Sequence, residues 1–143
     1  MYDLKGRIRI MASLMLCLAG CTDNAALTVV GETSLDDGLR AFESQEYDES
    51  VSLLSKALER GALNADLMCE ARLKRALARI ELEEYDLAQE DLDFLMEGAP
   101  DTSEVLAAMG RLALKQGDIE QAKKHYAEAR KINPAILLPS ELR

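Results

Sequence analysis

The stretch LAAMGRLALKQGDIEQAKKHYAEARKINP, residues 106–134, decides how this chain folds. It reads as two helices separated by the turn residues Gly117 and Asp118. Gly110 and Ala122 are small, which lets two antiparallel helices approach closely, with Tyr126 filling the space beside them. Pro134 ends the second helix, because proline cannot donate a backbone hydrogen bond. The stretch therefore predicts a packed helix pair.

The same pattern occurs twice more upstream. The residue 34 positions before Gly110 is Ala76, which opens a second copy with Tyr85, Ala88, Leu92, Leu95 and Pro100. A further 38 positions back, Gly38 opens a first copy with Ala41, Tyr47, Leu54 and Ala57. This first copy is degenerate because Ser50 replaces the packing alanine, and its extra residues fall in 59–66, where Asn64 or Asp66 is a candidate helix cap.

The last copy resembles the tetratricopeptide repeat, whose large, Gly, aromatic, Gly, aromatic, Ala, aromatic, Ala and Pro positions fall on Leu106, Gly110, Ala113, Gly117, Ile119, Ala122, Tyr126, Ala129 and Pro134. The resemblance implies an all-α solenoid of three antiparallel helix pairs in a right-handed superhelix. The repeats are expected at about 34–64, 67–100 and 103–134, with a short C-terminal cap over 135–143. Within this cap, the apolar run 136–138 either folds back or packs on another molecule, which leaves a homodimer through this end open.

Near the start of the chain, Leu18-Ala19-Gly20-Cys21 resembles the lipobox of bacterial lipoproteins. It follows a basic segment, 1–9, and an apolar segment, 10–17, that is shorter than the ~20 residues a membrane-spanning helix needs. The resemblance implies removal of residues 1–20 as a signal peptide, cleavage between Gly20 and Cys21, and diacylglycerol plus an acyl chain such as palmitate on Cys21. The alternative is an ordinary secretory signal.

The residue after the lipidated cysteine is Thr22, and in Gram-negative lipoproteins this favours the periplasmic face of the outer membrane over the inner membrane. Residues 21–33 are expected to form the lipidated cysteine and a flexible tether that reaches about 20 Å. No other cofactor is expected.

Charge limits the classes of partner. Without Asp3, Lys5, Arg7 and Arg9 of the signal peptide, 17 basic and 26 acidic residues become 14 and 25, a net charge of about −11. Such a chain opposes binding to phosphate backbones, so we expect no nucleic acid partner.

Arg72, Arg75 and Arg79 share one face of the second copy's first helix. They either clamp an anion or form a structural ion pair with Asp91 or the neighbouring glutamates, and the ion pair is the favoured interpretation because such pairing is common.

Catalytic patterns are missing from the sequence. His125 is the single histidine and is expected to face solvent. Cys69, the one cysteine outside the leader and lipobox, is expected to be a small buried side chain, with a disulfide between chains as the alternative. The carboxylates of 81–93 lack a calcium-binding loop, so we expect no metal, no small-molecule substrate and no enzymatic activity.

The resemblance also implies that ligands lie on the concave face formed by the first helix of each pair. Arg111 and Lys115 are expected to meet carboxylates or carbonyls of a partner at one end of this face. Internal packing of the same residues is the alternative. The expected peptide-binding residues are Leu35, Leu39, Phe42, Leu73, Leu77, Ile80, Arg111, Leu114 and Lys115.

Together these patterns predict a lipid-anchored adaptor that binds another envelope protein or its peptide segment. By resemblance, small lipoproteins of this kind serve envelope assembly, as pilotin-like or pilus and secretion factors. Scaffolding of peptidoglycan enzymes or proteases, and a self-associating structural spacer, are the alternatives.

Overall fold

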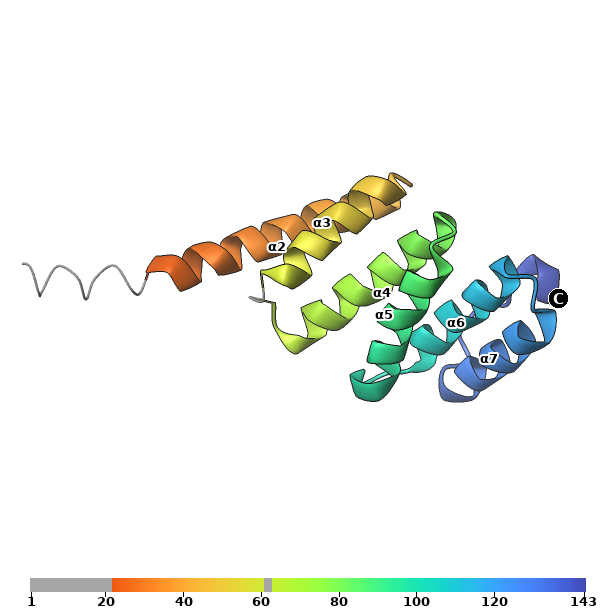
Figure 1. Ribbon diagram of the computed structural model, residues 1–143. Coiled ribbons are helices and arrows are strands. Elements are labelled where there is room, and N and C mark those ends of the chain that lie inside the picture. The colour runs from red at the N-terminus through yellow and green to blue at the C-terminus, as the bar shows by residue number, and fades with distance from the viewer. Residues whose placement is uncertain (1–21, 61–62) are drawn as a thin grey trace, which may run out of the picture.

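Three helix hairpins make up the part of the chain that the computed structural model describes, residues 22–60 and 63–143 (Figure 1). The expected all-α class of paired helices is confirmed. In this part of the chain, no helix is both long and apolar enough to cross a membrane. The elements are α2 (Thr22–Glu43), α3 (Tyr47–Glu59), α4 (Ala65–Glu81), α5 (Tyr85–Gly98), α6 (Ser103–Lys115), α7 (Ile119–Ile132) and the short 3-10 helix η1 (Ser140–Leu142).

The three turns inside the hairpins have the same geometry. Gln45, Glu83 and Gly117 each adopt a left-handed backbone, with φ of 63°, 63° and 84°. The following residue closes each turn by donating its N–H to the carbonyl five positions earlier. These bonds are all 2.9 Å long and join Glu46 to Ala41, Glu84 to Arg79 and Asp118 to Ala113. The turns are therefore copies of one motif, and only the last one uses glycine.

Side-chain caps begin two of the described helices, α4 and α7. Asn64 Oδ1 accepts a hydrogen bond of 2.9 Å from the Leu67 N–H, so of the two candidate caps for α4 it is Asn64 that acts. Asp118 caps α7 through the Gln121 N–H at 3.0 Å. These bonds satisfy backbone donors that have no partner within the helix.

Small residues bring the helices of a pair into contact, as expected. A Cβ added to Gly110 would lie 2.6 Å from the Tyr126 ring, and one added to Gly38 would lie 2.8 Å from the Leu54 side chain. Ser50 is fully buried and donates a 2.9 Å hydrogen bond to the Gly38 carbonyl. The serine that makes the first copy look degenerate thus joins α2 to α3.

The apolar core consists of two clusters along the array. One lies where the first two hairpins meet and contains Leu35, Leu54, Ala57 and Ala71. The other lies where the second and third hairpins meet and contains Ala76, Ile80, Ala88, Leu92, Leu95, Val105, Ala108 and Leu112. Each hairpin therefore completes its core with its neighbour.

The expected tether over 22–33 is wrong where the structure describes it, because these residues belong to α2. Gly31, Ser34 and Leu35 are buried, so α2 is anchored by packing from Gly31 onward. Extending an anchored helix gains one hydrogen bond for each residue ordered and needs no apolar face of its own. The expected signal peptide, its cleavage site and lipidated Cys21 lie outside the described residues.

The C-terminal segment after Pro134 returns over the last hairpin. Ile136 lines a cavity with residues of α6 and α7, and Leu138 lies beside the outer side of α7. Arg143 Nε donates a 3.1 Å hydrogen bond to the Leu138 carbonyl. Leu137, between the two half-buried residues, remains 81% exposed. The segment therefore covers the end of the array with part of its apolar run.

Candidate functional site

Three arginines of α4 converge on one buried carboxylate of α5. Asp91 is 2% exposed. Its Oδ1 accepts from Arg72 Nη1 at 3.1 Å and from Arg75 Nη2 at 2.7 Å. Its Oδ2 accepts from Arg75 Nε at 2.8 Å and from Arg79 Nη1 at 2.7 Å. The spacing of the arginines along α4 explains how all three reach the same carboxylate.

The remaining contacts of these arginines are also internal. Arg75 donates to Ser55 of α3 at 3.0 Å, which ties the cluster to the first hairpin. The Arg72 guanidinium stacks 3.8 Å from the centre of the Phe94 ring. Burial, followed by the charge of Arg75, lowers the pKa of Arg79 from its usual value. The geometry is that of a structural ion pair, the favoured interpretation, and not of an open anion clamp.

A second ion cluster joins α4 to α6. Glu81 binds Arg111 Nη2 at 2.7 Å and Lys115 Nζ at 2.9 Å. Burial by itself would raise the pKa of Glu81, but the hydrogen bond from Lys115 and the charges of both cations outweigh it and lower the pKa. Arg111 and Lys115 were expected to face a partner's carboxylates. They are instead held by Glu81, a long-range pairing that neither helix shows by itself.

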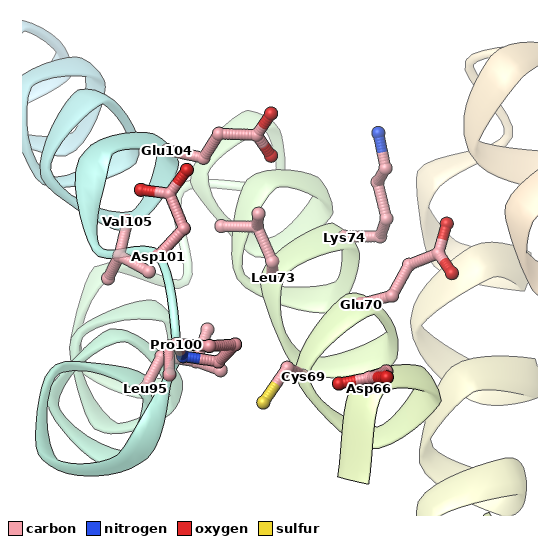
Figure 2. Close-up of a pocket in the computed structure, with 11 residues that line it drawn as sticks. Asp66, Cys69, Glu70, Leu73, Lys74, Leu95, Pro100, Asp101, Glu104 and Val105 are labelled. Atoms are coloured by element: carbon pink, nitrogen blue, oxygen red, sulfur yellow. The ribbon is translucent and has the colours of Figure 1, made fainter. Parts of the chain in front are cut away.

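A groove runs between α4 and α6. Its first part is a cavity of about 370 Å³ (Figure 2). A second cavity of about 380 Å³ shares Leu73, Lys74 and Glu104 with the first, so the two form one continuous surface. The second part ends at Ile136 and Leu137 of the C-terminal segment. We call this continuous surface the α4–α6 groove.

Some of the predicted concave residues line this groove and others do not. Leu73, Leu77 and Arg111 line it. Leu114 and Lys115 do not line the groove itself but a neighbouring cavity of about 570 Å³ beside Pro139 and Glu141, which adjoins the groove at Arg111 and Tyr126.

The other predicted concave residues belong to the packing between helices. Leu35 is 2% exposed and Ile80 is 0% exposed, so their expected place on a binding face is wrong. Residues of three helices enclose each of them in the two core clusters. Leu39 packs against the first of these clusters, and Phe42 makes an edge-to-face contact with Tyr47 at 5.8 Å between ring centres.

Sequence patterns missed the polar rim of the groove. Asp66, Glu70, Asp101 and Glu104 line its first part together with Cys69. Two of these carboxylates come from α4, and two from the start of α6 and the loop before it, so no single segment contains the cluster. Cys69 is half-buried, with its sulfur at the cavity wall (Figure 2).

His125 does not project freely into solvent as expected. It is half-buried, and its Nδ1 atom is buried without a hydrogen-bond partner among the described residues. It lines a cavity of about 320 Å³ with Gln89 and Asp118. Within the described residues, no three His, Cys, Asp or Glu side chains are grouped closely enough to hold a metal ion.

Comparison with known protein families gives a match over the last hairpin. Residues 103–136 match the model of the tetratricopeptide repeat, the stretch in which the resemblance is strongest. No curated protein matches the chain.

Proposed function

We propose that this tetratricopeptide-repeat chain is an adaptor that holds a segment of another protein in the α4–α6 groove. The observation that carries the proposal is the groove itself, which lies between the first helices of two successive hairpins and has an apolar floor. In the family that the chain resembles, ligands lie on this side of the array.

The groove floor has apolar surface left to bury. Leu73, Leu77 and Ala107 are only half-buried, although the first two pack against the core at their other side. Covering such surface contributes roughly 25 cal/mol per Å². A bound segment therefore gains affinity from side chains that already stand in a fixed geometry, with little cost for ordering the groove.

We further propose that the adaptor is anchored by acyl chains on Cys21 and serves envelope assembly at the periplasmic face of the outer membrane. The lipobox-like Leu18-Ala19-Gly20-Cys21 and the basic and apolar segments before it support this proposal. Several acyl chains make a stable anchor, whereas a single chain binds only marginally. Metabolic labelling with an alkyne fatty acid is expected to mark the wild type but not Cys21→Ala, and equal labelling would contradict the anchor.

A self-associating spacer is the second candidate. Ile132 is 55% exposed and Leu137 is 81% exposed, and both lie near the C-terminal end of the array. Light scattering on the purified chain separates the two functions, because a spacer forms dimers or larger assemblies through this end, and an adaptor needs none.

Photo-cross-linking in cells tests the adaptor directly. A benzophenone amino acid at Ala107, inside the groove, is expected to give a discrete cross-linked protein. The same amino acid at Ser52, exposed on α3 and away from the groove, serves as the control. Identification of the captured protein as an envelope component supports the proposed pathway. Products from Ser52 alone, or only cross-linked copies of the chain itself, would contradict the groove adaptor.

A further inference from the structure

We propose that the occupant of the α4–α6 groove is a cationic, apolar peptide segment of the partner, in which lysine or arginine alternates with aliphatic side chains. This inference rests on the proposed adaptor function and adds the chemistry of the ligand. Nothing in the repeat pattern itself requires it, since it comes from the charges that this chain places around the groove.

Carboxylates stand on both sides of the apolar floor. Asp66 and Glu70 project from α4, and Asp101 and Glu104 project from the opposite wall (Figure 2). The one basic side chain that lines this part of the groove is Lys74. The first part of the groove therefore has an excess of three negative charges.

Part of this charge has a local role. Asp66 and Glu104 lie in the first turns of their helices, where a carboxylate interacts favourably with the helix dipole. Asp101 accepts a 2.8 Å hydrogen bond from the Ser103 N–H, which lowers the pKa of Asp101. Glu70 lies beyond the first turn of α4 and has neither role. Within the described residues, Glu70 and Glu104 form no ion pair, so both are available to a cation.

The floor between the carboxylates is apolar. Figure 2 shows Leu73 and Cys69 on α4, with Leu95 and Pro100 across from Cys69 on the other side of the cavity. A ligand that satisfies the whole surface must combine aliphatic side chains with positive charge at both edges. An acidic peptide meets repulsion from the four carboxylates, which excludes it on charge.

The second part of the groove also favours a cationic, apolar ligand over an acidic one. Its own cation, Arg111, is already paired with Glu81 at 2.7 Å, so it offers little to an anionic ligand. Leu77, Ala107 and Ile136 continue the apolar floor toward the C-terminal segment. The charge that a ligand meets is therefore concentrated at the end formed by the starts of α4 and α6.

The direct test measures binding of two labelled probes to the full chain by fluorescence anisotropy. One probe is a short peptide of alternating leucine and lysine, and the other has glutamate in place of every lysine. The variant Glu70→Lys/Glu104→Lys reverses one charge on each wall. Glu59→Lys/Glu97→Lys makes the same change of net charge at exposed sites outside the groove.

The lysine peptide is expected to bind the wild type and the Glu59/Glu97 variant alike. The Glu70/Glu104 variant is expected to bind it about ten-fold more weakly, since each exposed charge contact is worth up to about a factor of five. Added salt is expected to reduce the difference between the variants by screening. The glutamate peptide is expected not to bind the wild type.

Cys69 reports whether the probe occupies this groove. In a Cys17→Ser/Cys21→Ser background it is the single thiol, and it lines the same cavity as Glu70 and Glu104. The lysine peptide is expected to slow alkylation of Cys69 by iodoacetamide in proportion to its occupancy. Binding that leaves this rate unchanged would place the peptide elsewhere and overturn the inference.

The inference would also be overturned if the wild type bound the lysine and glutamate peptides equally, or if the two charge-reversal variants bound the lysine peptide equally. These failures differ from failure of the adaptor. If a probe at Ala107 still cross-links to one specific partner, and Glu70→Lys/Glu104→Lys does not change this cross-linking, the groove adaptor holds and the cationic ligand is wrong. If Ala107 captures no partner, the adaptor itself fails.

Discussion

Replacing Asp91 with alanine removes the one acceptor on which three guanidinium groups of α4 converge. The carboxylate receives bonds of 2.7, 2.7, 2.8 and 3.1 Å and is 2% exposed. The arginine side chains remain only 13–24% exposed, so water replaces the lost acceptor incompletely. The substitution therefore leaves three clustered guanidinium groups on α4, of which, within the described residues, only Arg79 keeps a carboxylate partner, Glu84 at 3.9 Å.

The magnitude follows from these contacts. A hydrogen bond to a charged group contributes about 1.5–3 kcal/mol, but four such bonds to one carboxylate are not additive, and water reaches part of each arginine. Breaking a buried pair typically costs about 3–5 kcal/mol. For Asp91→Ala we expect the lower end of that range, about 3 kcal/mol.

Urea denaturation followed by circular dichroism measures this loss. With a slope of about 1.5 kcal/mol/M, the midpoint is expected to fall by about 2 M. Asp93→Asn, on the same helix, is the matched control, because Asp93 is exposed and accepts a bond only from Gln89 within the described residues, so its effect stays below about 0.5 kcal/mol. A loss below about 1 kcal/mol for Asp91→Ala would refute a structural role for the cluster.

Three further substitutions test other contacts. Gly110→Ala places a methyl group 2.6 Å from the Tyr126 ring and is expected to destabilise the fold by about 2 kcal/mol in thermal denaturation, and an unchanged midpoint would contradict the close approach. Glu83→Gly relieves a φ of 63° and is expected to stabilise the fold by about 0.5–1 kcal/mol in urea, whereas any loss would argue against strain there. Because the pKa of Glu81 is lowered in the fold, its ion pairs stabilise the protein above the unfolded value of 4.5, and that stability is lost as pH falls. Glu81→Gln is therefore expected to lose less stability than the wild type in an acid titration, and parallel curves would count against the pairing.

Features that depend on nearby residues could be predicted from the sequence. Gly110 and Tyr126 lie within one hairpin, and their spacing is enough to predict close helix packing. The convergence of arginines on Asp91 follows from helical periodicity once α4 and α5 are paired. Gly117 marks the last turn in the sequence, whereas the turns at Gln45 and Glu83 lack glycine and lie two repeats and one repeat before it.

Features that join separate segments could not be predicted in the same way. Glu81 is one of the carboxylates in the run 81–93, and only the packing of α4 on α6 brings it to Lys115. The rim of the groove likewise combines carboxylates from two helices and a loop. The burial of Leu35 and Ile80 depends on three helices meeting, which the pattern of one helix does not reveal. The helical start of α2 follows from anchoring at Gly31 and not from periodicity.

The most direct test of the central claim measures whether the groove is occupied in the cell. Cys69 lines the groove, and mass spectrometry can follow its alkylation both in intact cells and in the purified chain. An adaptor with a bound partner predicts several-fold slower alkylation in cells, and a cationic partner predicts weaker protection in Glu70→Lys/Glu104→Lys. Equal rates for the wild type in cells and in isolation would contradict the claim that this groove holds a protein segment.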